Sequence, residues 1–190
     1  MLMNKWFKYV LIMTFIIEGS AQVEQPLKNV LFIMVDDLRP ELNIYGQSHI
    51  KSPNIDALSS EGVTFNRAYC NVPVCGASRA SILSGLRPTE TRFLRYNASI
   101  NEAGSKTQNI VEYFNERGYQ TISNNKITHL KNDIKIWDEE WYPKDVTWRN
   151  YQDPINRNLD QNKKPAAAYE RLDIDDSAYF DAQTAEKTIE

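Results

Sequence analysis

The stretch 29-NVLFIMVDDLRP-40 decides how the rest of the sequence is interpreted, because it joins a continuous apolar run to a pair of carboxylates. An apolar run of the length of residues 29–35 is typical of a strand that is buried on both faces of a sheet. Asp36 and Asp37 then fall at the carboxyl end of that strand, where open α/β sheets bind their ligands. We therefore expect a buried strand that leads directly into a functional turn.

Helical and strand patterns alternate after this run. The expected elements are a helix over 52–62, a strand over 63–65, a helix over 75–85, a helix over 107–117 that ends before Gly118, and a strand over 119–123. This order predicts an α/β fold. Residues 131–176 show no clean periodicity, and we interpret them as an irregular insertion, either functional or a surface excursion. A helical pattern returns over 177–190.

The composition excludes several classes of protein. The chain has 190 residues, a formal net charge of −3, 42% hydrophobic residues and 25% charged residues, which is ordinary for a soluble globular protein. Because there is no surplus of basic residues to bind phosphates, the composition argues against a nucleic-acid binder. Two cysteines are too few for a disulfide framework.

The N-terminus has the pattern of a secretory signal peptide over residues 1–21. Lys5 and Lys8 precede the apolar run 9–17, and small residues follow at 19–21. The run is too short to cross a bilayer of roughly 30 Å, so we expect no stable membrane span. An uncleaved N-terminal anchor is the alternative. The pattern predicts that the protein is secreted or periplasmic.

Asp36 and Asp37 are candidate metal ligands. Two adjacent carboxylates repel each other unless a cation lies between them, and hard divalent cations such as calcium prefer oxygen ligands. An Asp pair is also common as a helix cap or in a solvated turn, so this interpretation stays open on the pair alone.

Cys75 begins the expected helix in the segment 75-CGASRASILSG-85. The N-terminus of a helix favours an anion, and Arg79 lies one turn further on the same face. A guanidinium suits an oxyanion because it donates two parallel hydrogen bonds. The pattern indicates either a cysteine nucleophile beside an anion site or a buried structural cysteine. We expect Cys70 to be a free, packed thiol, because a disulfide between the two cysteines would block this nucleophile.

Lys126 and His129 follow the expected strand over 119–123. A lysine and a histidine at a strand end are suited to binding an anion and moving a proton. A solvated loop is the alternative interpretation.

The segment 75–85 resembles the signature of the type I, formylglycine-dependent sulfatases, in which Cys-x-Pro/Ala-Ser-Arg is followed by three residues, an aliphatic residue and Thr-Gly. Ala77 stands where proline is commoner, and Ser84 stands in place of the threonine. The resemblance continues through most of residues 29–130 and 181–190, and it looks closest to the iduronate-2-sulfatase-like branch and its bacterial polysaccharide-degrading relatives. It implies the alkaline phosphatase-like α/β fold, with a mixed central sheet flanked by helices.

The resemblance also implies the chemistry of the cysteine. In this family the motif cysteine is oxidised to Cα-formylglycine, whose hydrate attacks sulfur, and a formylglycine-generating or anaerobic maturation enzyme performs the oxidation. Cys75 would be that residue. Arg79 would neutralise the formylglycine oxygen, and His129 would contact its hydroxyl and help to expel sulfate.

The remaining residues are implied to bind the metal and the sulfate. Asp36 and Asp37, together with the residue formed from Cys75, would hold Ca²⁺, and Lys126 would bind a sulfate oxygen. The family completes this site with an Asp-His or Asp-Asn pair, a second lysine and another histidine, which we do not find after His129 at a strand end. We therefore expect residues 22–190 to be the N-terminal part of a longer catalytic domain.

These features predict a sulfatase that hydrolyses sulfate esters, with a sulfated saccharide as substrate. The alternatives are a catalytically incomplete fragment, a remnant that binds sulfated glycans, a phosphonate or phosphate monoester hydrolase, and an unfolded product of a broken gene. Cys75 disfavours the phosphatases of this fold, which use Ser or Thr at that position.

Overall fold

A computed structural model describes residues 28–145 and 149–190 of the chain. The chain divides into a segment that ends at Phe32 and a unit from Ile33 to Glu190, and every contact reported below lies within the second unit. The signal peptide expected over residues 1–21 lies outside the described residues. Within the described part, no helix combines the length and the apolar character needed to cross a membrane.

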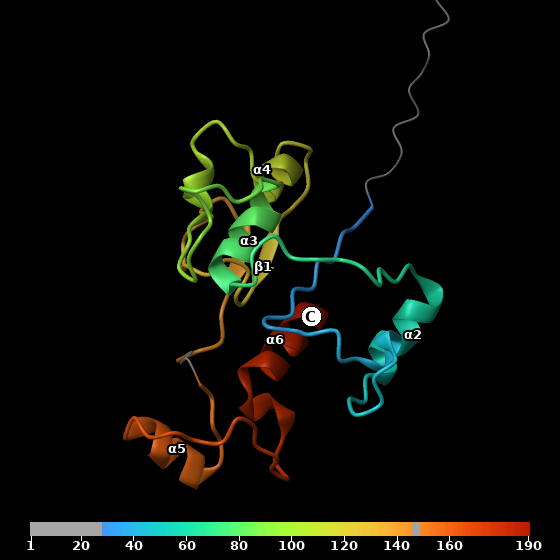
Figure 1. Ribbon diagram of the computed structural model, residues 1–190, viewed down its shortest axis with the longest axis vertical. Helices are drawn as coiled ribbons and strands as arrows, with labels where there is room; N and C mark the ends of the chain where they lie inside the picture. Colours follow the sequence, from blue (N-terminus) through green and yellow to red (C-terminus); the bar gives the residue numbers. More distant parts are fainter. Residues whose placement is uncertain (1–27, 146–148) are drawn as a thin grey trace, which may run out of the picture. The chain divides into compact units, whose positions relative to one another are not determined.

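Short helices and two short strands make up the described elements (Figure 1). In chain order they are η1 (Asn43–Tyr45), α2 (Pro53–Glu61), α3 (Cys75–Ser84), η2 (Ile100–Ala103), α4 (Ile110–Asn115), β1 (Ile122–Asn124), β2 (Glu139–Trp141), α5 (Pro154–Gln161), η3 (Asp176–Ala178) and α6 (Phe180–Ile189). The chain is therefore mixed α/β, as the sequence predicts.

Local signals place the helices close to their expected positions. Pro53 opens α2, and Gly85 ends α3 in the left-handed conformation with φ 69°. α4 is shorter than the expected 107–117, because the Asn109 side chain accepts from the backbone N–H groups of Val111 and Glu112 and so fixes where the helix begins. These three helices confirm the sequence prediction.

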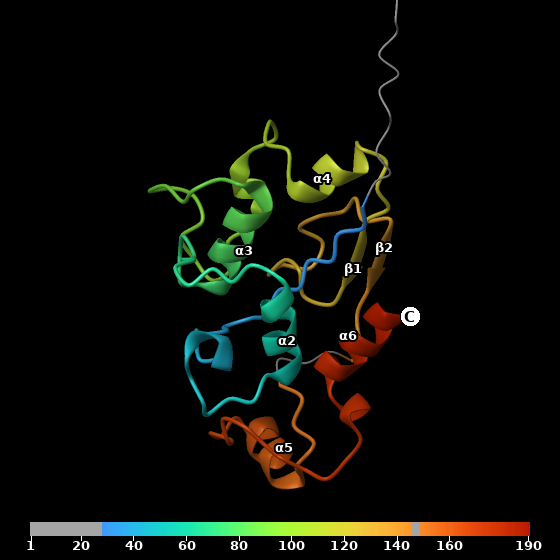
Figure 2. The ribbon, with the colours of Figure 1, turned by 90° about the vertical axis from the view of Figure 1, so that its right-hand side faces the viewer.

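β1 and β2 form a two-stranded parallel sheet, in which Ile122 pairs with Glu139 and Asn124 pairs with Trp141. Figure 2 shows the two strands side by side, and α6 contacts β1. The strand expected over 119–123 begins later, at Ile122. β2 and α5 lie inside residues 131–176, so the prediction of an irregular insertion is wrong over these two elements.

Residues 29–35 do not form the expected strand. Leu31 and Ile33 are 71% and 70% exposed, and no strand among the described residues pairs with this run. The strand expected over 63–65 is also absent from the described structure, and Val63 is exposed. A central sheet needs neighbouring strands to bury such runs, and the two strands described here are too few to do so.

The core lies around α3, which is buried along most of its length. One cluster joins Ala77 and Ala80 to Phe93 and Ala98. A second cluster joins Leu83 to residues of η2 and α4, with which α3 is in contact, and to Ile134. Because α3 is buried, it fixes the positions of the residues in its first turns, which begin at Cys75.

Candidate active site

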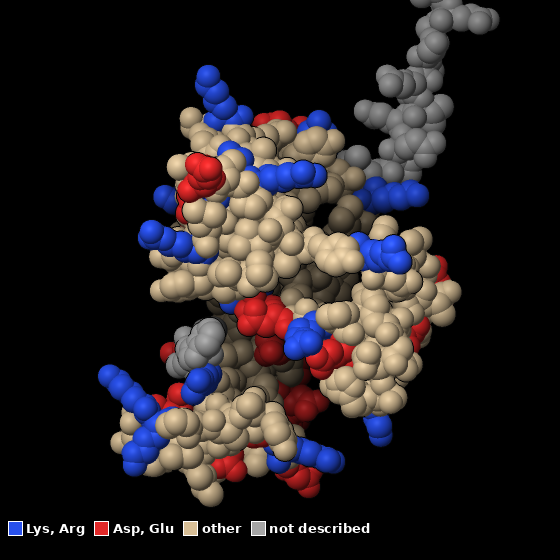
Figure 3. All heavy atoms as spheres, in the orientation of Figure 1, with Lys and Arg blue, Asp and Glu red and all other residues tan. Residues whose placement is uncertain are grey.

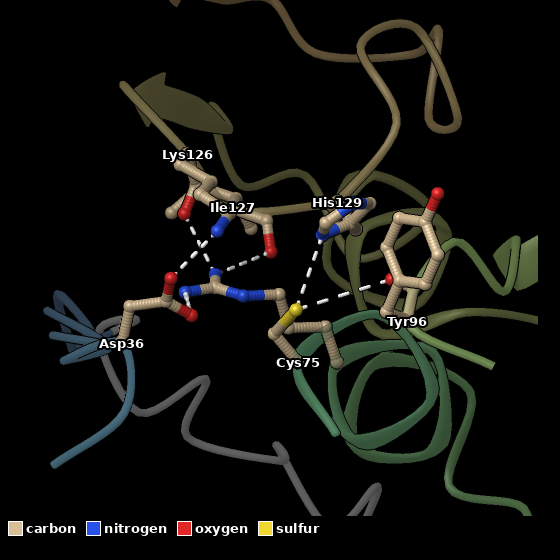
Figure 4. Close-up of polar contacts among 7 residues, drawn as sticks. Asp36, Cys75, Tyr96, Lys126, Ile127 and His129 are labelled. Atoms are coloured by element: carbon tan, nitrogen blue, oxygen red, sulfur yellow. Dashed lines mark hydrogen bonds and ion pairs between the residues drawn. The ribbon is translucent and has the colours of Figure 1, made fainter. Parts of the chain in front are cut away.

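Five of the six residues singled out in the sequence come together in one place (Figure 4). They come from the turn after residue 35, from the first two turns of α3, and from the loop that follows β1: Asp36, Cys75, Arg79, Lys126 and His129. The sequence separations between interacting pairs run from 43 to 90 residues, so the fold itself assembles this cluster.

Cys75 is the first residue of α3 and lies partly exposed beside a proton acceptor. Its Sγ atom is 3.4 Å from Nδ1 of His129 and 3.9 Å from the carbonyl oxygen of Tyr96. No side chain caps this helix N-terminus, so the free N–H groups of the first turn favour negative charge close to the sulfur. Cys70, in contrast, is free as expected but exposed instead of packed.

Arg79 is the buried centre of the cluster, with a side chain that is 6% exposed. Its Nη1 donates to the carbonyl oxygens of Lys126 at 2.7 Å and of Ile127 at 2.9 Å. Its Nη2 donates to Oδ1 of Asp36 at 2.8 Å. The guanidinium therefore holds the backbone of the loop after β1 and one carboxylate at the same time.

Asp36 pairs with two cations. Besides Arg79, it binds Lys126, whose Nζ lies 2.6 Å from Oδ2. Burial of the carboxyl raises its pKa, but the hydrogen bonds and positive charges of Lys126 and Arg79 outweigh this effect and hold the pKa below 3.8. Asp36 is therefore ionised at neutral pH, and the three charges leave a net positive centre.

His129 has a lowered pKa. Burial lowers it first, and the charges of Lys126 and Arg79 lower it further, against the opposing effect of Asp36 and Asp133, so it falls below 6.5. The imidazole is then neutral at pH 7, and in the tautomer protonated at Nε2 its Nδ1 accepts a hydrogen bond from the Cys75 thiol. The ring meets the Tyr96 ring edge to face, with centroids 5.8 Å apart.

Asp37 does not join the cluster. It adopts the left-handed conformation with φ 53°, which aspartate tolerates, and it makes no hydrogen bond or ion pair to the other described residues. Ca²⁺ takes about six to eight oxygen ligands. The described chain holds no group of three or more His, Cys, Asp and Glu side chains suited to a metal, and both oxygens of Asp36 already bind cations. The carboxylates fit calcium in kind, but they do not make a site alone.

Tyr96 is the residue that sequence reasoning missed. A Cβ on Gly76 would lie 2.0 Å from the carbonyl oxygen of Tyr96, so the glycine lets this loop touch the start of α3. No periodicity marks Tyr96, and only the glycine after Cys75 hints at a close backbone approach. His49, the other histidine, is paired with Glu41 and takes no part in this cluster.

A family model described as "Sulfatase" matches residues 28–190, which is most of the chain and includes every residue of this cluster. The chain belongs to the sulfatase family. Figure 3 shows Lys and Arg interspersed with Asp and Glu on the face displayed. Neither sign of charge dominates the displayed face of this sulfatase-family chain.

Curated relatives of this sulfatase-family chain carry related names. The human iduronate 2-sulfatase is 41% identical over 112 residues, which are 59% of this chain and 20% of that protein. A sulfatase of Formosa agariphila is 39% identical over 117 residues, 58% of this chain and 23% of its own length. An ulvan-active sulfatase of the same organism is 27% identical over 174 residues, 87% of this chain and 33% of that protein. The chain thus spans about a fifth to a third of these relatives.

Proposed function

We propose that this chain supplies the cysteine-centred part of a sulfatase active site, which hydrolyses sulfate esters carried by a saccharide. The observation that carries the proposal is the position of Cys75, 3.4 Å from a neutral histidine and one helical turn from a buried arginine that is tied to Lys126. The family match supports the reaction class. Two relatives named as acting on iduronate 2-sulfate and on ulvan support a sulfated saccharide as the substrate.

Cys75 is proposed as the site of Cα-formylglycine, formed by a formylglycine-generating or anaerobic maturation enzyme. The hydrated aldehyde would supply a hydroxyl nucleophile to the sulfur atom. The partial exposure of Cys75 at the start of α3 suits this use, because a nucleophile must be reached by its substrate. The uncapped helix N-terminus favours the negative charge that develops beside it.

Lys126 and Arg79 are proposed to stabilise the sulfate group. The Lys126 side chain is 34% exposed. It ends in an ammonium group on a flexible alkyl chain, which donates up to three hydrogen bonds and is therefore suited to bind a sulfate oxygen. The Arg79 side chain is nearly buried and committed to two carbonyls and Asp36. The positive charge of Arg79 is proposed to act on the sulfate group over a short distance. Its hydrogen bonds fix where Lys126 lies.

His129 is proposed to hold and move the proton of the nucleophile. Its lowered pKa keeps Nδ1 free to accept a proton at neutral pH, which is the requirement for a general base. Once protonated, the same atom returns the proton in the reverse direction.

Asp36 and Asp37 are proposed to contribute two of the ligands of a Ca²⁺ ion, which would neutralise charge on the sulfate oxygens when bound. Residues 1–21 are proposed as a signal peptide that directs the protein to the periplasm or the exterior. Residues 22–190 are then the N-terminal part of the catalytic domain.

The proposal is tested by co-producing the chain with a formylglycine-generating enzyme and analysing the peptide that contains Cys75 by mass spectrometry. We expect the mass change for replacement of the thiol by an aldehyde, which Cys75→Ala removes and Cys70→Ala does not. Sulfate release from a 2-O-sulfated uronate disaccharide is then measured in the presence of Ca²⁺.

Conversion at Cys75 together with sulfate binding supports the proposed formylglycine site. Sulfate release supports the proposed hydrolysis of the ester. A chain that binds the sulfated disaccharide but is never converted at Cys75 is a glycan-binding protein, which overturns the proposed enzyme activity. Hydrolysis of a phosphate monoester in preference to the sulfate ester overturns the reaction class.

A further inference from the structure

We infer that Tyr96 is a substrate-contacting residue, whose exposed ring forms the wall against which the sugar ring of a sulfated saccharide lies. This inference rests on the proposed function and adds a determinant of specificity to it. The residue types are unevenly distributed across the cluster, which has a charged end and an aromatic end.

Figure 4 shows these two ends. Asp36 and Lys126 lie on one side of Cys75, and the ring of Tyr96 lies on the other side, beside His129. The ring centroids of Tyr96 and His129 are 5.8 Å apart with an angle of 84° between the planes. A molecule with an anionic group at Lys126 therefore extends past Cys75 toward the Tyr96 ring.

The backbone of Tyr96 is fixed, so its ring is held at the site and does not move on a free loop. Gly76 of α3 lies against the Tyr96 carbonyl, closely enough that a Cβ would come within 2.0 Å. Phe93 is fully buried, and its N–H donates to Glu102 at 2.6 Å. The Ala98 N–H donates to the carbonyl oxygen of Arg95 at 3.0 Å. A pre-ordered contact loses less entropy when a ligand binds.

The Tyr96 side chain is not needed for the core, because the residue is 65% exposed. An aromatic ring offers an apolar face and, for tyrosine, a hydroxyl that hydrogen-bonds to polar groups. A pyranose matches this pair of properties with an apolar C–H face and peripheral hydroxyls. The neighbouring Arg95 is exposed, and its side chain makes no hydrogen bond or ion pair to other described residues, so it is available to a second anionic group on a saccharide.

Another role for Tyr96 would be to orient His129 through their edge-to-face contact. The two roles differ in which ligand they affect. A positioning role alters the environment of His129 for every ligand, whereas a contact with the sugar ring alters the affinity for saccharides and leaves the affinity for inorganic sulfate unchanged.

The experiment measures the binding of two probes, inorganic sulfate and a 2-O-sulfated uronate disaccharide, to the purified full chain by calorimetry in the presence of Ca²⁺. Tyr96→Ala is compared with Tyr96→Phe, which keeps the ring, and with Tyr169→Ala, which removes another exposed tyrosine. We expect Tyr96→Ala to weaken disaccharide binding by about fivefold. Tyr96→Phe and Tyr169→Ala should retain it, and the affinity for sulfate should not change in any of the three variants.

Equal disaccharide affinity in the wild type and Tyr96→Ala overturns the inference, while the proposed function stands if Lys126→Met still weakens sulfate binding. Parallel loss of sulfate and disaccharide affinity in Tyr96→Ala makes Tyr96 a positioning residue and also overturns the contact. A dependence on Tyr96 for 4-nitrophenyl sulfate but not for the disaccharide overturns the choice of a saccharide. A wild-type chain that binds neither probe overturns both proposals.

Discussion

The guanidinium of Arg79 holds the carboxylate of Asp36 at 2.8 Å, across 43 residues of sequence. The same guanidinium donates to two carbonyl oxygens of the loop after β1. A single buried side chain therefore joins the turn at residue 36, the helix α3 and the loop that carries Lys126 and His129. Stability and site geometry depend on the same residue.

Arg79→Met removes all three of these hydrogen bonds and leaves Asp36 with Lys126 alone. Since hydrogen bonds to charged groups are the stronger ones, we expect the free energy of unfolding to fall by about 2 kcal/mol or more. Urea denaturation followed by circular dichroism measures the change. Arg87→Met is the matched control, because Arg87 is exposed and its side chain makes no hydrogen bond or ion pair within the described residues. Equal loss in both variants would refute the role of Arg79.

The pairing of Asp36 makes stability depend on pH. Because the pKa of Asp36 is lower in the folded chain than its ordinary value, the carboxylate contributes stability above its unfolded pKa. That stability is lost as the pH falls through the lower, folded pKa. We expect the difference in stability between the wild type and Asp36→Asn to shrink below about pH 4. Denaturation midpoints measured between neutral and acid pH test this, and a constant difference would contradict it.

His129 should titrate below 6.5, because burial and the Lys126 charge both disfavour its protonated form. Lys126→Met removes the nearby positive charge, so we expect the pKa of His129 to rise. Histidine ring resonances followed by NMR against pH measure the shift. Lys135→Met is the control, since Lys135 is exposed and is not among the charges that act on His129. An unchanged pKa in Lys126→Met would show that burial alone sets it.

Gly76→Ala places a methyl group where the Tyr96 carbonyl already lies, with a Cβ–oxygen distance of 2.0 Å. The backbone must move, so we expect a destabilisation of about 3 kcal/mol and a loss of the Cys75–His129 contact. Gly62→Ala is the matched control, because its Cβ would meet only the Leu58 carbonyl at 3.3 Å. Thermal unfolding compares the two variants, and similar melting temperatures would argue against the close approach.

Local chemistry explains which elements could be predicted from the sequence. α2 and α3 begin and end at residues whose own conformation limits the helix, such as Pro53 and Gly85. The run 29–35 carries no such information about its partners, and a strand exists only when another strand pairs with it. Polar contacts between residues far apart in the sequence hold part of residues 149–176 in place. Glu170, for example, accepts hydrogen bonds from the backbone N–H groups of Gln152 and Asp153, and no sequence period encodes such a pair.

The candidate site could be predicted from the sequence where the residue type itself indicates a chemical role. Cys75, Lys126 and His129 stand at a helix start and after a strand, and the fold brings them together. Asp37 was expected to act with Asp36, but it makes no hydrogen bond or ion pair with the other described residues. Tyr96 could not be found, because its position depends on a loop anchored from both sides by Phe93 and Gly76.

The ion pairs of Asp36 with Arg79 and Lys126 mean that the cluster already contains its own counter-anion. A sulfate ester that reaches Lys126 meets an ammonium that is already paired, so it shares this cation with the Asp36 carboxylate or takes its place.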